Sequence, residues 1–176
     1  MSGQVRLRPF TLADVNEHNA GEDAESVRWL TEGQESTVAS TTRWIEGHAN
    51  ARRDHCGEQV FAVELDGRLA GMVAANLDAY GLGLAAGEVN LSYAVHPWAR
   101  RRGVARCAIA LMCAWLGDCG LGDRAVIRVD PANEASIRTA RSCGFTALGP
   151  RTSPSGDVLE HFVRPIPGPQ GNGPPR

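Results

Sequence analysis

Apolar residues recur along the chain at spacings that predict a mixture of strands and helices. The predicted strands are residues 5–9, 59–65, 68–77, 88–96, 124–130, 145–148 and 158–163. Apolar residues at helical spacing predict one or two short helices within 11–30, longer ones over 37–53 and 103–118, and a short one over 133–143. Asp66-Gly67 is typical of a hairpin turn between two of the strands. The glycine-bearing stretch 78–87 is predicted to be a loop.

This order of elements predicts one domain of the mixed α/β class (α+β, with a mixed sheet) over residues 1–164. A chain of 176 residues is long enough to bury a substantial core. Residues 165–176 are rich in proline and glycine and hold little that could be buried. They are therefore predicted to form a disordered tail.

The composition limits the classes of function. The formal net charge is −2, so basic charge is local, and nucleic-acid binding is not expected as the main task. No apolar run approaches the roughly 20 residues that span a bilayer. Residues 1–6 lack the apolar core of a signal peptide, so we expect no membrane contact and a cytoplasmic location. The five cysteines form no CxxC pair, and no metal site is expected.

A basic turn joins the predicted strand 88–96 to the predicted helix 103–118. It holds three consecutive arginines followed by Gly103. The N-terminus of a helix offers unpaired N–H groups and partial positive charge to an anion, and a glycine lets a ligand approach the backbone closely. The turn is therefore predicted to bind an anion, for which phosphate fits best. The alternative is a solvated basic patch.

Two motifs carry a resemblance to a known family. The turn, Arg100-Arg101-Arg102-Gly103-Val104-Ala105, resembles the (Gln/Arg)-x-x-Gly-x-(Gly/Ala) pyrophosphate loop of the GNAT acyltransferases. The segment Asn133-x-x-Ser136-x-Arg138-x-Ala140-x-x-x-Gly144-Phe145 resembles the second signature of the RimJ/RimL branch, which acetylates protein N-termini. Shorter matches to that branch are Leu7-Arg8-Pro9-Phe10, Arg28-Trp29-Leu30 and Pro97-Trp98-Ala99-Arg100. The resemblance runs from about residue 5 to about residue 164.

The resemblance implies the GNAT acyl-CoA N-acyltransferase fold, in which a twisted mixed sheet splays at its fourth strand and is flanked by helices. It implies acetyl-CoA or another acyl-CoA as co-substrate, and no metal. The pantetheine would run along residues 92–96, and the pyrophosphate would lie on the turn. The residues thus assigned to the cofactor are Ala94, Val95, Arg100, Arg101, Arg102, Gly103, Val104, Ala105, Asn133 and Ser136. Dimers are common in this branch, so a homodimer is one expectation.

The same resemblance implies direct attack of a primary amine on the thioester. The branch expects a glutamate base where this chain has Asn90, which cannot take a proton. Glu88 lies two residues earlier on the same face of the strand and is the first candidate base. Its alternative role is that of a solvated residue at the start of a strand. His96 and His161 are the other candidate bases.

Other predicted site residues have structural alternatives. Ala140 stands where many relatives have the tyrosine that protonates the leaving thiolate, so Ser136 is the candidate acid. Ser136 could instead bond its own helix backbone, and Asn133 could simply cap that helix. Trp29 and Asn90 are the predicted acceptor contacts. Trp29 and Trp44 could equally belong to the core, and Trp98 is expected to pack beneath the turn.

A weak or displaced base favours an acceptor that is already neutral. At pH 7 about 10–17% of an α-amine is neutral, against roughly 0.04% of a lysine amine. The predicted acceptor is therefore a protein or peptide α-amine, or a small-molecule amine of low pKa. The departures at Asn90 and Ala140 leave a non-catalytic acyl-CoA-binding module as the alternative. A Rossmann-type nucleotide-binding domain is disfavoured, because no GxGxxG follows the first strand.

Overall fold

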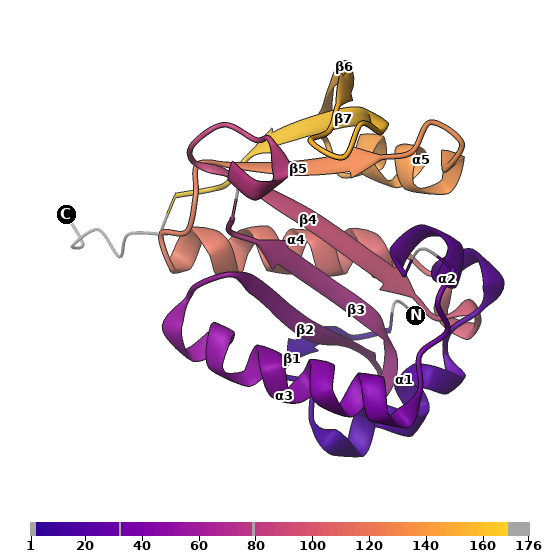
Figure 1. The fold of residues 1–176 in the computed structure, drawn as a ribbon. Coiled ribbons are helices and arrows are strands. Elements are labelled where there is room, and N and C mark those ends of the chain that lie inside the picture. The colour runs from indigo at the N-terminus through magenta and orange to yellow at the C-terminus, as the bar shows by residue number, and fades with distance from the viewer. Residues whose placement is uncertain (1–2, 32, 79, 169–176) are drawn as a thin grey trace.

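A computed structural model of the protein describes residues 3–31, 33–78 and 80–168. Its strands are β1 (Val5–Arg8), β2 (Glu58–Leu65), β3 (Arg68–Asn76), β4 (Glu88–Val95), β5 (Arg124–Val129), β6 (Thr146–Thr152) and β7 (Val158–Pro165). The α-helices are α1 (Val15–Ala20), α2 (Ala24–Leu30), α3 (Val38–Asp54), α4 (Val104–Asp118) and α5 (Glu134–Ser142). Short 3-10 turns occupy Leu12–Asp14, Tyr80–Leu82 and Pro97–Ala99. Figure 1 shows their arrangement.

The seven strands form one sheet in the order β1-β2-β3-β4-β5-β7-β6. Neighbouring strands are antiparallel except β4 and β5, which run parallel. The β2–β3 hairpin closes through Asp66 (φ 54°) and Gly67 (φ 83°), both in the left-handed region that a two-residue turn of this kind requires. The predicted mixed sheet and hairpin are confirmed.

Helices cover both faces of the sheet (Figure 1). The larger core lies between α4 and the sheet. The buried positions of α4 recur at helical spacing and pack on the apolar side chains of the strands. These positions are Val104, Ala108, Ile109, Met112, Cys113, Leu116 and Gly117. A second, smaller core lies under α1 and α3 and contains Phe10, Val15, Ile45, Val60, Ala62, Leu69 and Ala74. Both faces being covered explains why the central strands are apolar on both sides.

The sheet opens between its two parallel strands. β4 and β5 pair at only three positions, 88–90 with 124–126, whereas β4 remains paired with β3 as far as Val95. Beyond the paired positions the strands diverge toward their C-terminal ends, at the right of Figure 1. The predicted splay at the fourth strand is therefore present, and it leaves one edge of β4 without a strand partner.

Besides shifts of one or two residues at the ends of other elements, three segments differ from the sequence prediction. β6 continues to Thr152 instead of ending at residue 148, because Gly149 and Pro150, which have the composition of a turn, lie in an exposed edge strand that pairs only with β7. The loop 78–87 contains the turn Tyr80–Leu82. Pro165 and Ile166 belong to the domain rather than to the tail, since Pro165 ends β7 and Ile166 is buried against the larger core. Residues 169–176 of the predicted tail lie outside the described residues. Among the described residues, no helix is long and apolar enough to cross a membrane.

Candidate functional site

The unpaired edge of β4 presents backbone hydrogen-bonding groups to the gap beside β5. Backbone groups of successive strand residues alternate between the two edges. The N–H of His96 donates to the carbonyl of Ala70, next to β3. Tyr93 and Val95, which lie beyond the positions paired with β5, therefore have their backbone groups facing the gap, where an extended ligand could pair with them as a strand does.

The two residues predicted to bind pantetheine through their backbone are placed differently. The carbonyl of Ala94 faces β3, where a Cβ added to Gly71 would collide with it. The carbonyl of Val95 faces the gap but accepts a hydrogen bond from Arg100 Nε at 3.0 Å. The geometry thus leaves the N–H of Val95 for a ligand and turns the backbone of Ala94 away from it.

The turn after β4 exposes the first N–H groups of α4. Arg101 (φ 61°) and Gly103 (φ 76°) have left-handed backbone conformations, and Gly103 is the N-cap residue with no side-chain cap. The first bond from this end of the helix runs from the N–H of Cys107 to the carbonyl of Gly103. The N–H groups of Val104 and Ala105 have no partner within the helix. A Cβ at Gly103 would meet open space, so a ligand has room to reach them.

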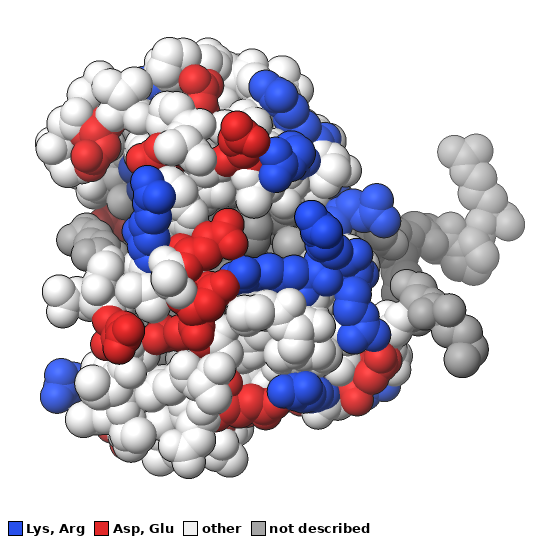
Figure 2. All heavy atoms as spheres, turned by 90° about the vertical axis from the view of Figure 1, so that its right-hand side faces the viewer, with Lys and Arg blue, Asp and Glu red and all other residues white. Residues whose placement is uncertain are grey.

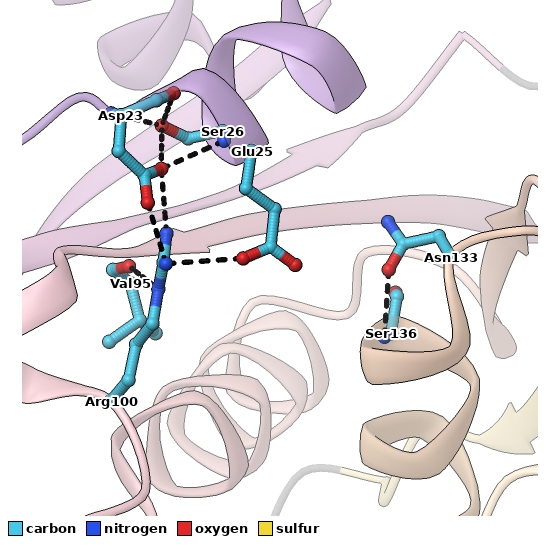
Figure 3. A network of polar contacts seen from close by, with 7 residues as sticks. All are labelled: Asp23, Glu25, Ser26, Val95, Arg100, Asn133 and Ser136. Atoms are coloured by element: carbon cyan, nitrogen blue, oxygen red, sulfur yellow. Dashed lines mark hydrogen bonds and ion pairs between the residues drawn. The ribbon is translucent and has the colours of Figure 1, made fainter.

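The side chain of Arg100, the first arginine of the turn, points toward Asp23 at the start of α2 (Figure 3). Arg100 donates from Nη1 and Nη2 to the two carboxylate oxygens of Asp23 at 2.7 and 2.8 Å, and from Nη1 to Glu25 at 3.2 Å. These bonds hold the pKa of Asp23 well below its usual range. Asp23 is also the N-cap of α2 and accepts the N–H of Ser26. Arg100 therefore joins the turn to α2. Its guanidinium binds protein carboxylates in place of the phosphate that the sequence predicted.

The other two arginines of the turn remain exposed. Arg102 lies 4.0 Å from Asp66, which is a loose surface pair, and Arg101 has an exposed side chain. Figure 2 looks onto this end of the molecule and shows basic side chains beside a patch of acidic ones. Arg101 and Arg102 can therefore turn toward an anion at the helix N-terminus without breaking a buried ion pair.

Asn133 and Ser136 lie at the start of α5, across from the Arg100 network (Figure 3). Asn133 Oδ1 accepts the N–H of Ser136 at 3.0 Å, so Asn133 caps α5. The Ser136 hydroxyl is 2.9 Å from the hydroxyl of Tyr93 on β4, and either atom can donate. Burial raises the pKa of Tyr93, which keeps the phenol protonated. This hydroxyl pair connects β4 to α5 across the splayed part of the sheet.

The carboxylate of Glu88 is already engaged. Glu88 is 4% exposed, and its side chain pairs with Arg124 at 3.2 Å and accepts the N–H of Ala85 at 3.0 Å. Asn90, on the same face of β4, lies at the last position paired with β5. Its Oδ1 accepts a hydrogen bond from Arg128 Nε at 3.0 Å. The point where the sheet opens therefore carries an amide and a guanidinium rather than a free carboxylate.

The two alternative bases are neutral at physiological pH. His96 and His161 are each 4% exposed. Burial lowers the pKa of His96 to about 4, with His18 contributing. Burial also lowers the pKa of His161, helped by Arg151 and Arg128. His161 lies opposite Arg128 in the β5–β7 pairing, whereas His96 follows the last residue of β4.

The tryptophans divide between core and surface. Trp44 packs with Phe10 and His18 in the smaller core. Trp98 packs against the larger core and carries Arg68 over its ring at 4.2 Å. Trp29 is half-buried, with Arg28 over its ring at 4.4 Å. An open cavity of about 750 Å³ lies beside α2, lined by Asn19, Glu22, Asp23, Ala24, Val27, Arg28, Gly33, Glu35 and Ser36. Trp29 is not part of this lining.

Sequence reasoning missed three residues that the structure brings to the site: Asp23, Tyr93 and Arg128. Asp23 could have been found as a helix cap, since Asp23 and Ser26 are spaced as a capping pair. Tyr93 lies between residues already assigned to the site, but its partner on α5 is 43 residues away. Nothing local marks Arg128, whose contacts come from β4 and from the loop before it.

A splayed pair of parallel strands beside an uncapped helix N-terminus defines an α/β protein that binds a phosphate-bearing ligand along a strand edge. Residues 4–146 match the sequence model of the acetyltransferase (GNAT) domain. The chain therefore belongs to the GNAT acetyltransferase family, and the predicted family, fold and N-acetyltransferase class are confirmed.

Solved structures of similar fold include two enzymes of the RimJ/RimL branch. The ribosomal L7/L12 α-N-protein acetyltransferase RimL, in complex with coenzyme A, has a TM-score of 0.75 at 15% identity, over 92% of this chain and 94% of RimL. Mycobacterium smegmatis RimJ, in complex with CoA-disulfide, has a TM-score of 0.74 at 18% identity, over 93% and 83%. The aminoglycoside acetyltransferase AAC(6')-Ib, in complex with coenzyme A, has a TM-score of 0.74 at 17% identity, over 92% and 95%. The search of curated proteins gave no match.

Proposed function

We propose that the protein transfers an acetyl group from acetyl-CoA to an α-amine, either of a peptide N-terminus or of a small molecule with a similarly low pKa. The observation that carries this proposal is the free edge of β4 leading directly to the uncapped N-terminus of α4. A thioester held along that edge would lie near Asn90, where the sheet opens. RimL, the ribosomal L7/L12 α-N-protein acetyltransferase, and RimJ, solved in complex with CoA-disulfide, share this fold.

The residues at the helix N-terminus fit a pyrophosphate. The unpaired N–H groups of Val104 and Ala105, the left-handed Gly103, and the exposed Arg101 and Arg102 would hold it. Val95 N–H would bond the pantetheine, and the free amide NH₂ side of Asn133 would face it. Arg100 would act indirectly, by fixing the turn against α2.

In the proposed reaction the neutral amine nitrogen attacks the thioester carbonyl and the carbon–sulfur bond breaks. Ser136 would give the leaving thiolate its proton, and Tyr93 would replenish that proton through the 2.9 Å hydroxyl contact. The new ammonium would lose its proton to water, and Tyr93 would regain a proton from solvent, so that the net transfer runs from the amine to the thiolate. Glu88 is a poor base in this geometry because its carboxylate is buried and paired with Arg124. The engaged carboxylate supports an acceptor that arrives neutral, as an α-amine does.

The test is a coenzyme A release assay with acetyl-CoA over N-terminal peptides, Nα-blocked lysine peptides, polyamines and aminoglycosides. We expect turnover with α-amines and slower turnover with lysine side chains. Faster turnover with lysine side chains than with every α-amine would overturn the acceptor class. Tight acetyl-CoA binding with no accepted amine would support a non-catalytic binding module instead.

Two glycine variants test the loop. Gly103 and Gly120, at opposite ends of α4, have φ values of 76° and 66°, and a Cβ at either meets nothing within 4 Å. Gly103→Ala and Gly120→Ala should each destabilise the fold by about 1–2 kcal/mol through the left-handed backbone. Only Gly103→Ala should weaken acetyl-CoA binding, by about 10-fold or more, because its methyl group enters the anion site. Equal affinities in calorimetric titrations would contradict the loop assignment.

A further inference from the structure

Arg128 is a partly buried cation with neutral protein partners. Its Nε donates to Asn90 Oδ1 at 3.0 Å, and Nη1 donates to the carbonyl of Leu82 at 3.2 Å. A guanidinium has five N–H donors, and these two bonds leave the Nη2 side of the fork unoccupied by any described residue. Within the described part of the chain, no carboxylate lies within ion-pair distance of Arg128.

Two other half-buried arginines, Arg8 and Arg100, have acidic partners, whereas the half-buried Arg164 donates to the carbonyl of Cys143. Arg8 bonds Asp14 and Glu64, and Arg100 bonds Asp23 and Glu25. Even Arg124, on the same face of β5 as Arg128 and only half-sheltered, pairs with the buried Glu88. A counter-charge stabilises a desolvated cation, and Arg128 differs from Arg164 in bonding Asn90, at the point where the sheet opens.

The surroundings of Arg128 cannot supply that counter-charge. The nearest acidic group on the neighbouring strand, Glu88, is committed to Arg124 and to the N–H of Ala85. On the other side, β7 places the buried, neutral His161 opposite Arg128. Burial lowers the pKa of Arg128, yet the group stays charged at pH 7. A net positive charge therefore persists at this point.

Arg128 also lies where an acceptor would react. It bonds directly to Asn90, at the last paired position of β4 and β5. Arg128 is two residues beyond Val126, which pairs with Asn90, and the same face carries both. Its free donors are therefore at the start of the gap rather than on a remote surface.

We propose that Arg128 is the specificity-determining residue of the acceptor site and binds a carboxylate that the amine acceptor carries near its reacting nitrogen. This inference rests on the proposed N-acetyltransferase function and narrows its substrate class. The carboxylate comes either from an acidic first or second side chain of a peptide or from the α-carboxylate of a free amino acid. Asn90 and the carbonyl of Leu82 keep the guanidinium in place and accept one donor each, which leaves Nη2 and the second N–H of Nη1 for the substrate oxygens.

The experiment compares acceptors that differ only in charge. Peptides beginning with Asp or Glu are assayed against their Asn or Gln counterparts, all C-terminally amidated, and free amino acids against their amides. The variants are Arg128→Gln and Arg128→Lys, with Arg43→Gln on the exposed surface of α3 as matched control. Kinetics are measured at saturating acetyl-CoA, and acetyl-CoA affinity is measured separately.

We expect the wild-type protein to favour the carboxylate member of at least one series by about 10-fold or more in kcat/KM. Arg128→Gln should reduce this preference, measured as the ratio of kcat/KM for the acid and amide acceptors, to less than about 2-fold, whereas Arg43→Gln should leave that ratio unchanged. Arg128→Lys should retain part of the preference, because charge remains but the fork is lost. The series that responds identifies the source of the carboxylate.

Two results would overturn the inference. One is equal kcat/KM for the acid and amide members in the wild-type protein, which leaves the proposed transferase function intact. The other is an acid preference that survives in Arg128→Gln. If no amine is turned over, the proposed function fails. In that case the role of Arg128 is tested by calorimetric titration of the coenzyme A-bound protein with the same peptide pairs. Equal affinities for the acid and amide peptides would overturn the inference.

Discussion

Replacing Asp23 by asparagine should loosen the contact between α2 and the turn after β4. Asparagine is as good an N-cap as aspartate, so Asp23→Asn keeps the bond from Ser26 to Oδ1. It removes the charge that faces Arg100 and replaces the oxygen that accepts from Nη1 by an NH₂ donor. Two short bonds, at 2.7 and 2.8 Å, are affected. The third contact of the guanidinium, to Glu25 at 3.2 Å, remains.

The size of the effect follows from burial. The side chains of Arg100 and Asp23 are 33% and 31% exposed, between fully exposed pairs, which contribute about 0.2–1 kcal/mol, and buried pairs, whose rupture costs about 3–5 kcal/mol. We expect Asp23→Asn to lower the free energy of unfolding by about 1–2 kcal/mol. For a chain of this length that corresponds to a fall in Tm of about 2–8 °C. Asp23→Ala should lose about 1 kcal/mol more, because the cap is also removed.

The assay is urea denaturation of the wild-type protein, Asp23→Asn, Arg100→Gln and the double variant. The double-mutant cycle should give a coupling energy of about 1–2 kcal/mol between the two side chains. Glu17→Gln is the matched control, since Glu17 pairs with Arg68 at 3.2 Å with both side chains more exposed, and it should change stability by less than about 0.5 kcal/mol. A coupling energy near zero would refute the reasoning that this pair anchors α2.

Further predictions concern the hydroxyl pair, a buried histidine and the end of the domain. Ser136→Ala should lower kcat by about 100-fold, and Tyr93→Phe should lower kcat by less. Neither variant should change the KM for acetyl-CoA much. An unchanged kcat in steady-state assays would contradict the proposed proton path. Burial lowers the pKa of His96 to about 4, so the unfolded state binds more protons than the folded state between pH 6.5 and 4. The free energy of unfolding should therefore fall by up to about 3 kcal/mol as the pH decreases across that window. Urea titrations of His96→Gln should show a shallower fall, and identical slopes would exclude this origin. Gly117→Ala would place a Cβ 1.9 Å from the carbonyl oxygen of Pro167 and should lower stability by about 1–3 kcal/mol in thermal unfolding, whereas wild-type stability would show that this packing does not form.

The central strands and long helices could be predicted because their apolar periodicity is also their burial pattern. Nearly all residues of β2 and β3 are buried, and α4 buries one face. In these elements the apolar residues of the local sequence therefore coincide with the residues buried in the fold. β6 could not be predicted to its full length, because its seven residues are almost all exposed and Gly149 and Pro150 have the composition of a turn. Because β6 is an edge strand that pairs only with β7, its sequence does not alternate between apolar and polar residues as a half-buried strand does.

The site was predictable where its chemistry is local. The turn with Gly103 is a contiguous segment, and backbone geometry there follows from the residues themselves. The roles of charged side chains were not predictable, because their partners lie far away in sequence. Glu88 has the residue type and face expected of a base, but Arg124 sits opposite it in the parallel ladder. Arg100 has its partner 77 residues earlier, on α2.

The three arginines of the turn therefore have different roles: Arg100 positions the turn, and Arg101 and Arg102 are available to bind an anion. Arg100 is fixed to Asp23 and to the carbonyl of Val95, so it sets the path of the chain between β4 and α4. Arg101 and Arg102 keep exposed guanidiniums, and the helix N–H groups supply the directional contacts. Charge removal at Arg101 or Arg102 should weaken acetyl-CoA binding in a salt-dependent way, because exposed charges are screened. Charge removal at Arg100 should instead reduce stability, since its contacts are to the protein itself.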